Sequence, residues 1–290
     1  MQRTFVVGCP RSGTTLVQAL LGRHPAVQTL PETAFFEHLH GDLEWRWGDH
    51  DAKPHRRKWR HRLGFAHKRA RETLARLQGS LSDGSRPRGA PWRVGSCANR
   101  FVRTLDDYAA ANGHTMWLEK TPYHLLYFPE IEREVPEARF IHVIRNGEEV
   151  LASVADANMR FDRNGAFGGG TMHWSRRWNR AAQIHRANAG RPQHHFMFLE
   201  DLIADEDGEW RRLCIFLGLD PDIDLDEKCS QLVADLTREP WKQGAVHGVP
   251  RPVKCKAERV FGPQVRQWLQ RHLLSYDELH QACAPTGTRR

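Results

Sequence analysis

The segment from residue 3 to residue 20 constrains the fold of this chain more than any other part of its sequence. Residues 3–7 form a short run of β-branched and aromatic side chains, which is typical of a buried strand. The run ends at Gly8, and after Thr14 apolar side chains recur at helical spacing. A strand that enters a helix through a glycine-containing turn is suited to phosphate, because the N–H groups of the turn converge and the helix N-terminus is partially positive. We therefore predict an α/β protein with an anion site at this turn.

The turn departs from the nucleotide-binding phosphate loop at one position. Gly8 and Gly13 enclose four residues, as in that loop, but Thr14 occupies the position of its lysine. The departure disfavours a kinase or an ATPase, which binds the β- and γ-phosphates through this lysine. Arg11 supplies a cation within the turn and is suited to a shorter anionic group. A tight turn that binds no ligand is the alternative interpretation.

Composition narrows the partners and the chemistry. The formal net charge of +8 favours an anionic partner: a nucleotide, an acidic substrate or a nucleic acid. The six cysteines are scattered without metal-ligand spacing, so we expect buried thiols and no metal site. No apolar run is long enough to span a bilayer, and Met1 and Gln2 lead directly into the first strand. We therefore expect a cytoplasmic protein with no membrane partner.

A basic region interrupts the α/β pattern. Residues 40–110 are rich in Trp and Arg, and we predict a mostly helical insertion within a single domain that covers residues 1–290. The charge gathers in one short span: Lys53, Arg56, Arg57, Lys58, Arg60, Arg62, Lys68, Arg69 and Arg71. Three interpretations stay open: a solvated face, a patch for an acidic substrate and a nucleic-acid footprint. Because no nucleic-acid-binding module is recognisable, we expect no nucleic-acid partner.

The α/β pattern resumes beyond the insertion. Residues 115–119, 139–144 and 195–199 have the apolar character of strands and alternate with helical segments. This alternation predicts a parallel sheet covered by helices on both faces. Ligands bind such sheets beyond the carboxyl ends of the strands, where we expect the first turn, Lys120 and Arg145 to converge.

Three further features bear on a site at this edge. Pro31 and Glu32 are typical of the first turn of a helix, and this geometry alone favours a helix-terminus role for the carboxylate over a catalytic one. Arg145 and Ser153 are eight residues apart, and their guanidinium and hydroxyl groups form a second anion site. Residues 238–261 are rich in Gly, Pro and Lys, which predicts a long loop.

Together these motifs resemble a known family. Residues 8–15 resemble the 5′-phosphosulfate loop of sulfotransferases that use 3′-phosphoadenosine 5′-phosphosulfate (PAPS), and residues 144–153 resemble their 3′-phosphate site. Residues 198–202 resemble a recurrent strand-end segment of the family, although Leu199 stands where the family usually has Tyr. The likeness is greatest to tyrosylprotein sulfotransferases, in which Pro-Arg-Ser-Gly-Thr-Thr-Leu and a His-Pro precede a Glu that acts as base. The matching residue here is Glu32.

The resemblance implies a P-loop-like sulfotransferase fold and an activity. The protein would move the sulfuryl group of PAPS, without a metal ion, to the hydroxyl of a peptide or protein tyrosine, and the basic insertion would suit an acidic acceptor. Glu32, Arg11 and Lys120 would be catalytic. The cofactor ligands would be Pro10, Arg11, Ser12, Gly13, Thr14, Thr15, Arg145 and Ser153. A sulfotransferase for a carbohydrate or small-molecule hydroxyl and a basic nucleic-acid-binding protein stay open as alternatives, as does a homodimer.

Overall fold

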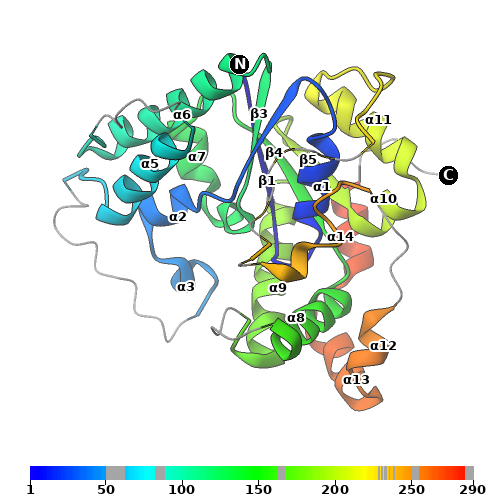
Figure 1. Ribbon diagram of the computed structural model, residues 1–290. Coiled ribbons are helices and arrows are strands. Elements are labelled where there is room, and N and C mark those ends of the chain that lie inside the picture. The colour runs from blue at the N-terminus through cyan, green and yellow to red at the C-terminus, as the bar shows by residue number, and fades with distance from the viewer. Residues whose placement is uncertain are drawn as a thin grey trace.

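A five-stranded parallel sheet lies at the centre of the protein (Figure 1). The computed structural model describes residues 1–49, 63–81, 89–161, 167–227, 229, 231, 234, 236–237, 239–249 and 255–284. The strands are β1 (Gln2–Gly8), β2 (Val27–Leu30), β3 (Met116–Lys120), β4 (Arg139–Ile144) and β5 (His194–Phe198), in the order β2-β3-β1-β4-β5. Every pairing is parallel, which confirms the predicted class of fold. Because β1 is central, the turn that follows it lies between the ends of β3 and β4.

Three helices cover one face of the sheet: α1 (Thr14–Leu21), α10 (Leu199–Ala204) and α11 (Glu206–Leu217). Their apolar side chains form one core cluster with Val6 of β1, Ile141 of β4 and Met197 of β5. Successive side chains of a strand point to opposite faces of its sheet. The neighbours of these residues therefore belong to the core on the other face, where Phe5 and Phe140 lie.

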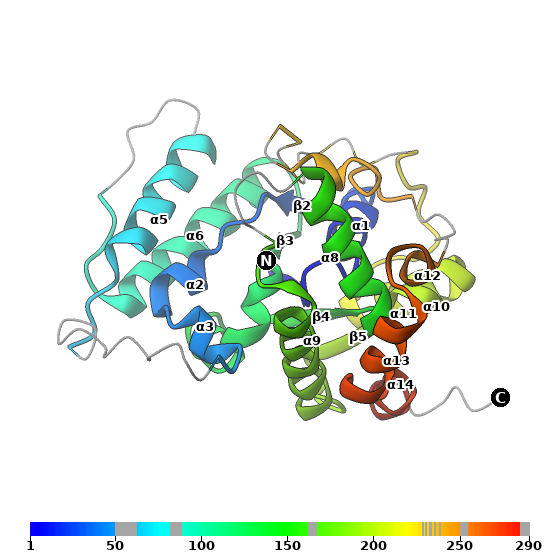
Figure 2. The same ribbon diagram turned by 90° about the horizontal axis from the view of Figure 1, so that it is seen from below.

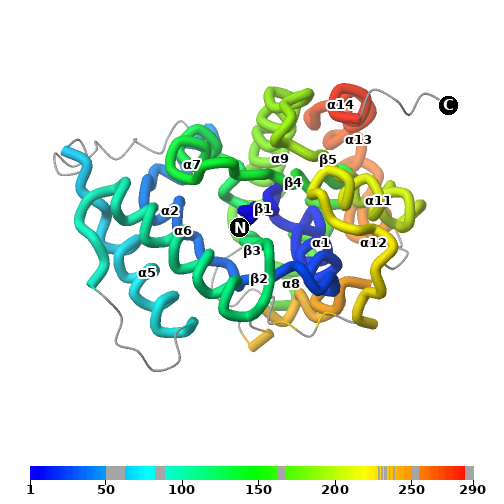
Figure 3. Tube along the Cα trace, turned by 90° about the horizontal axis from the view of Figure 1, so that it is seen from above, coloured from blue at the N-terminus to red at the C-terminus, as the bar shows by residue number. Residues whose placement is uncertain are grey.

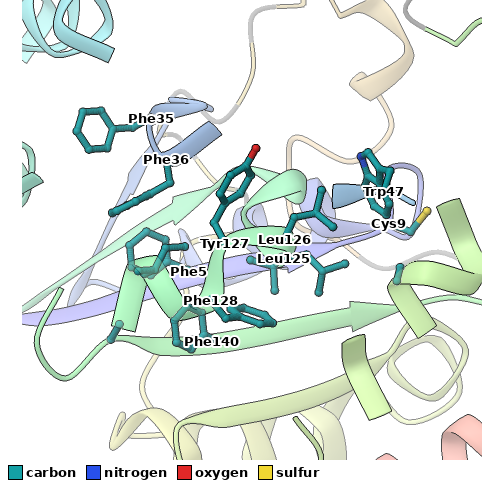
Figure 4. Packing of buried hydrophobic residues seen from close by; sticks show 14 of the residues in the cluster. Phe5, Cys9, Phe35, Phe36, Trp47, Leu125, Leu126, Tyr127, Phe128 and Phe140 are labelled. Atoms are coloured by element: carbon teal, nitrogen blue, oxygen red, sulfur yellow. The ribbon is translucent and has the colours of Figure 1, made fainter. Parts of the chain in front are cut away.

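The opposite face is buried beneath a larger set of elements: α2 (Phe35–His40), α5 (Lys68–Leu81), α6 (Val94–Ala111), the 3₁₀ helix η1 (Pro122–Tyr127), α7 (Phe128–Glu134), α9 (Gly170–Ala187) and α14 (Tyr276–Cys283). The ring of Phe5 stacks on Phe140 with 5.8 Å between the ring centroids (Figure 4). It also meets the ring of Trp117 edge-on, at 5.3 Å between centroids. Seen from above, α2, α5 and α6 lie on one side of β1, and α1 and α11 lie on the other (Figure 3). Helices thus cover both faces, as predicted.

The remaining elements gather toward the carboxyl ends of the strands. They are α3 (Leu43–Arg46), α8 (Gly147–Phe161), the 3₁₀ helix η2 (Pro240–Lys242), α12 (Lys256–Val260) and α13 (Pro263–His272). Figure 2 views the molecule from this end, with α8 and α9 near its middle. Helix α8 contacts α9, η2 and α12. The edge of the sheet at which ligands bind parallel α/β proteins is therefore framed by α8 and by segments from late in the chain.

The segment after α1 differs from the prediction. Residues 27–30 form the edge strand β2, which the sequence analysis missed, and helix α2 begins at Phe35 rather than at Pro31. Glu32 therefore lies in the loop between β2 and α2 and is not a helix-terminus carboxylate. All four residues of β2 are buried, so the strand shows no alternation of polar and apolar side chains. Helix α2 begins where side chains from the segment 119–124 bind the N–H groups of Thr33, Ala34 and Phe36, and such contacts leave no local signal.

The region of the predicted insertion contains α3, α5 and α6. The last three residues of the basic cluster lie on α5, where the guanidinium of Arg71 stands 3.6 Å from the ring centroid of Trp92. The cluster members between residues 53 and 62 lie outside the described residues. The predicted loop 238–261 contains η2 and α12, so part of it is helical. Across the described ranges, no helix combines the length and the apolar character needed to cross a bilayer.

Candidate active site

Close backbone contacts shape the turn that follows β1. A Cβ atom on Gly8 would lie 2.4 Å from the carbonyl oxygen of Val143, so glycine is needed for β1 and β4 to come this close. Gly13 has a φ of 100°, in the left-handed region that glycine tolerates, and a Cβ there would lie 3.0 Å from Leu199. Arg11 has a positive φ of 73°, which is uncommon for residues other than glycine and recurs at functional sites. The spacing of the two glycines therefore follows from the geometry of the turn.

The turn offers hydrogen-bond donors that a ligand can use. The first N–H groups of a helix have no partner within it, and α1 has no side-chain cap. Thr14 and Thr15 are buried in its first turn, and Pro10 has no N–H group to donate. Among the described residues, no group is hydrogen-bonded to the buried hydroxyl of Ser12. Leaving such a group without a partner is costly, so the turn fits an anion that accepts several hydrogen bonds.

Arg11, Arg145 and Ser153 meet beside this turn, and we call them the guanidinium cluster. Nε of Arg11 donates a hydrogen bond to Oγ of Ser153 at 3.2 Å. A guanidinium nitrogen of Arg145 donates to the backbone oxygen of Arg11 at 3.4 Å. Burial, with a smaller contribution from the charge of Arg145, lowers the pKa of Arg11 to about 10. Both groups carry a positive charge at neutral pH, and the cluster concentrates this charge next to the donors of the turn.

Contacts on both sides of Arg145 fix its position. Its backbone oxygen accepts a hydrogen bond from the indole N–H of Trp178 at 3.1 Å, and its guanidinium pairs with Glu149 at 3.1 Å. The Glu149 carboxylate also accepts the N–H groups of Lys256 and Ala257, each at 3.0 Å. Burial alone would raise the pKa of Glu149, but these donors and Arg145 lower it. Glu149 therefore joins the second anion site to the start of α12.

Glu32, Lys120 and Lys242 form a second group, which we call the lysine–glutamate cluster. Oε1 of Glu32 contacts Nζ of Lys120 and lies 2.6 Å from Nζ of Lys242. Lys120 is fully buried at the carboxyl end of β3, whereas the side chain of Glu32 is 32% exposed. Burial alone would raise the pKa of Glu32, but the two ammonium groups lower it to about 2. Glu32 is therefore ionised at neutral pH and open to solvent on one side.

The sequence analysis missed Lys242. It lies on η2, within the segment predicted as a loop, and it also pairs with Glu239. Burial lowers the pKa of Lys242, but the two carboxylates, Glu32 and Glu239, raise it above its ordinary value. For Lys120 burial prevails, and its pKa is lowered. No local pattern distinguishes Lys242 from the other lysines of its segment, because its contact with Glu32 joins residues 210 positions apart.

Aromatic side chains join the two clusters. The ring of Trp241, next to Lys242, meets the ring of Phe167 edge-on at 5.1 Å between centroids. The guanidinium carbon of Arg11 in turn lies 5.8 Å from the centroid of the Phe167 ring. Phe167 therefore links the segment that carries Lys242 to Arg11 of the guanidinium cluster.

A cavity of about 790 Å³ opens beside Glu32. It is bounded by the β2–α2 loop and by residues of β2, α2, α5 and α6, including Leu30, His38, Arg76 and Tyr108. Its lining mixes apolar side chains with Thr, Ser and His. Glu32 is one of the residues that line this cavity.

The segment that follows β5 contacts the two turns that carry Arg11 and Arg145. The Glu200 carboxylate accepts the N–H of Asn146 at 3.0 Å and the hydroxyl of Tyr276 at 2.7 Å. Leu199 packs against Gly13, as described above. Leu199 and Glu200 of the predicted strand-end segment therefore contact the turns that carry the guanidinium cluster. In the part of the chain that the structure describes, no group of three or more His, Cys, Asp or Glu side chains is arranged to hold a metal ion.

Comparisons with known proteins agree on one family. A profile described as the sulfotransferase family matches residues 3–223. A Caenorhabditis briggsae protein named "Putative protein-tyrosine sulfotransferase" is 25% identical over 220 residues, which are 75% of this chain and 66% of the relative. The matched segment thus spans just under two thirds of that relative.

Solved structures of sulfotransferases are also similar to this chain. The sulfotransferase domain of the Synechococcus PCC 7002 olefin synthase is 17% identical with a TM-score of 0.48, covering 90% of this chain and 93% of its own. A mouse sulfotransferase in complex with 3′-phosphoadenosine 5′-phosphate (PAP) is 12% identical with a TM-score of 0.48. The match covers 97% of this chain and 84% of the mouse chain. The family match includes every residue of both clusters except Lys242.

Proposed function

The chain belongs to the sulfotransferase family, and we propose that it transfers the sulfuryl group of PAPS to the hydroxyl of a peptide or protein tyrosine. The observation that carries the proposal is the presence of both clusters at one edge of the sheet. The guanidinium cluster concentrates positive charge beside the unpartnered donors of the first turn. The lysine–glutamate cluster holds an ionised carboxylate next to two ammonium groups and a cavity. Anion binding and proton removal are therefore available in one site.

The donor site follows from the residues of the turn and of α8. PAPS supplies a sulfuryl group attached to its 5′-phosphate, and it carries a 3′-phosphate. The N–H groups at the start of α1, the Ser12 hydroxyl and Arg11 would hold the 5′ end, and Arg145 with Ser153 would hold the 3′-phosphate. Positive charge comes from the side chains themselves, so the proposal includes no metal ion. Loss of one preorganised donor of this kind costs about 10²–10³ in rate.

Glu32 is the proposed base, and its surroundings set how strong a base it is. With a pKa of about 2 it is ionised at neutral pH but weakly basic. Withdrawal of either ammonium group toward an anion would raise this pKa toward 4.5, the ordinary value for Glu. The ammonium groups of Lys120 and Lys242 can therefore pair with either of two anions, the carboxylate of Glu32 or a negatively charged donor. Proton removal by a positioned base contributes about 10²–10⁴ in rate.

Four points support a tyrosine acceptor. The Caenorhabditis briggsae relative carries a protein-tyrosine sulfotransferase name. A phenol, with a pKa of about 10, is deprotonated by a carboxylate base more easily than a sugar hydroxyl is. The cavity beside Glu32 is also large, at about 790 Å³, and the net charge of +8 suits an acidic peptide. We propose no nucleic-acid partner.

The thiols support the proposed cytoplasmic location. All six cysteines lie in described residues, and each is a free thiol. Burial raises the pKa of Cys9 to about 12, so the cysteine of the first turn is an inert thiol and not a nucleophile. Unpaired thiols are typical of reducing compartments.

Thermal unfolding with nucleotides tests the donor. We expect 3′-phosphoadenosine 5′-phosphate (PAP) to stabilise the protein more than 5′-AMP or ATP·Mg²⁺, by about 2.7 kcal/mol at a hundredfold its Kd. Arg145→Ala should remove this preference, whereas Arg211→Ala, a matched change at an exposed arginine of α11, should retain it. Stronger stabilisation by ATP·Mg²⁺ than by PAP would contradict the proposal.

Transfer assays with PAPS test the acceptor. A peptide with tyrosine among acidic residues should be sulfated, and the same peptide with phenylalanine should not, because it lacks the hydroxyl. Turnover on a carbohydrate or small-molecule hydroxyl but not on the peptide would retain the donor assignment and refute the tyrosine acceptor.

A further inference from the structure

One buried carboxylate contacts the chain neighbours of two proposed catalytic residues, Glu32 and Lys120. Glu119 is fully buried on β3, directly before Lys120. Its Oε1 accepts the N–H of Thr33 at 3.0 Å, the hydroxyl of Thr33 at 2.9 Å and the hydroxyl of Thr121 at 2.6 Å. Thr33 follows Glu32 in the chain, and Thr121 follows Lys120. A single carboxylate oxygen therefore holds the chain neighbours of both proposed catalytic residues.

The second oxygen of Glu119 has its own partner. Its Oε2 lies 2.9 Å from Nδ1 of His124, which is fully buried on η1. Nε2 of His124 accepts the N–H of Phe36 at 3.3 Å, so the proton of a neutral ring lies on Nδ1, the nitrogen nearest to Glu119. Burial alone would raise the pKa of Glu119, but His124 and the donors on Thr121 and Thr33 lower it. Glu119 is therefore held as an anion in the core.

The same network sets the path of the loop that carries Glu32. Four successive N–H groups from Thr33 to Phe36 are bound by it: Thr33 donates to Glu119, Ala34 to the hydroxyl of Thr121 at 3.1 Å, Phe35 to the hydroxyl of Thr33 at 3.2 Å, and Phe36 to His124. These groups lie at the start of α2, whose own residues provide no side-chain cap. The position of Glu32 thus depends on side chains of β3 and η1 rather than on the local sequence.

We propose that Glu119 is a positioning residue for the transfer reaction, because it sets the placement of Glu32 relative to Lys120. The inference rests on the proposed function for the roles of these two side chains. An anion in the core is costly to bury, and replacing it with apolar side chains often stabilises a protein. Its four polar contacts instead join two segments that are 86 positions apart in the sequence. This arrangement suits fixed geometry at the site, where a misplacement of about 1 Å costs on the order of 10²-fold in rate.

Glu119→Gln tests the role with little change in volume. An amide has one acceptor oxygen and one donor nitrogen, so it cannot keep both the contacts to Thr33 and Thr121 and the contact to Nδ1 of His124. We expect kcat to fall by about 10²-fold while KM for PAPS and the thermal shift with PAP stay near their wild-type values. The acid limb of the pH–rate profile should move to higher pH, because a Glu32 that is held less closely to its lysines has a higher pKa. Thr33→Val removes the hydroxyl contacts to Glu119 and to the N–H of Phe35 but keeps the carboxylate, so it should give a smaller change of the same kind.

Glu209→Gln is the matched control. Glu209 is also a buried carboxylate, but it lies on α11 and pairs with Arg212. Its loss should leave kcat and the pH profile unchanged. A wild-type pH profile and kcat in Glu119→Gln would overturn the inference, and so would a rise in KM for PAPS with kcat unchanged. If Glu119→Gln does not fold, Thr33→Val and Thr121→Val decide by the same readouts.

A measurement without turnover separates this inference from the proposed function. The coupling between Glu32→Gln and Lys120→Met in chemical unfolding reports how closely these side chains are held. We expect most of this coupling to be lost in the Glu119→Gln background and to be retained in the Glu209→Gln background. Absence of transfer by the wild-type protein would refute the proposed function while this coupling still tests the positioning. Full coupling in the Glu119→Gln background would overturn it.

Discussion

The guanidinium cluster and the lysine–glutamate cluster lie at the same edge of the sheet but differ in how their charge is compensated. Across the described ranges, Arg145 pairs with Glu149, whereas Arg11 has no carboxylate within ion-pair distance. In the other cluster, two lysines are matched by two carboxylates, Glu32 and Glu239. The first cluster therefore keeps a net positive charge for an anion, and the second is neutral as it stands.

This difference indicates which cluster binds an anion first. A site with uncompensated positive charge attracts an anion without any rearrangement. A neutral ion-pair network has to exchange partners before one of its lysines can bind an anion or its carboxylate can accept a proton. The structure thus combines a proposed donor site that keeps its positive charge with a proposed catalytic cluster in which Glu32 is weakly basic.

The largest expected effect separates the two clusters outright. Glu32→Gln removes the proposed base, and we expect kcat for a tyrosine peptide to fall by about 10²–10⁴. The thermal shift with PAP should be unchanged, because the guanidinium cluster is intact. Steady-state kinetics and thermal unfolding measure both quantities. Full turnover by this variant would mean that Glu32 is not the base.

Lys242→Met tests the partner exchange within the second cluster. The change removes one of the two ammonium groups on Glu32, so the pKa of Glu32 should rise and the acid limb of the pH–rate profile should move to higher pH. We expect kcat to fall by about 10–10² because one charge near the donor is lost. Lys256→Met, which removes a lysine paired with Asp156, is the matched control for a lost lysine and should shift the acid limb little. An unchanged acid limb in Lys242→Met would show that Lys242 does not act on Glu32.

Ser153→Ala is a small change within the guanidinium cluster. It removes the hydroxyl that accepts a hydrogen bond from Arg11, and with it one neutral donor for a 3′-phosphate. We expect binding of PAP to weaken by about 3–10-fold, in line with about 1 kcal/mol for one hydrogen bond. Binding of 5′-AMP, which lacks the 3′-phosphate, should change little. Equal weakening for both nucleotides in calorimetric titrations would place Ser153 elsewhere in the donor site.

The smallest expected effect is on stability against pH. The pKa of Glu32 is about 2 in the folded protein, below its ordinary value of 4.5. Its contribution to the free energy of unfolding is therefore complete above pH 4.5 and is lost as the pH falls toward 2. A shift of one pKa unit corresponds to about 1.4 kcal/mol, and solvent screening of this partly exposed side chain reduces the effect.

The comparison is made between wild type and Glu32→Gln by chemical unfolding from pH 6 downward. Subtracting the two unfolding free energies removes the contribution of His142, His185 and His194, whose pKa values are lowered by burial in both proteins. We expect the difference in unfolding free energy to shrink as the pH falls. A difference that stays constant would mean that the lysines do not stabilise the ionised form of Glu32.

Much of the fold was predictable because its central elements carry their own signals. Residues 139–144, predicted as a strand, are β4 with the same bounds, since a buried strand in a parallel sheet is a continuous apolar run. The turn after β1 was predictable because two glycines and the change of periodicity lie within one short segment. Arg145 follows directly from β4, so its position at the carboxyl end of the sheet was also predictable.

The parts that the sequence analysis missed depend on contacts between distant segments. Strand β2 is short and fully buried, and α2 begins where Glu119 and His124 bind the N–H groups of Thr33 and Phe36. Lys242 pairs with a carboxylate at the other end of the chain. None of these features alters the local pattern of apolar side chains, so none is visible before the chain is folded.

The amino-acid order thus specified the strand–turn–helix unit, the parallel sheet and the side chains of the guanidinium cluster, because burial on the faces of strands and helices imposes a period that the sequence must obey. The folded chain settled which oxygen Lys120 and Lys242 share, where α2 begins and how Glu119 holds the loop of Glu32. These are ion pairs and hydrogen bonds between side chains far apart in sequence. Their energies depend on distance in space, and distance in space is a property of the packed structure alone.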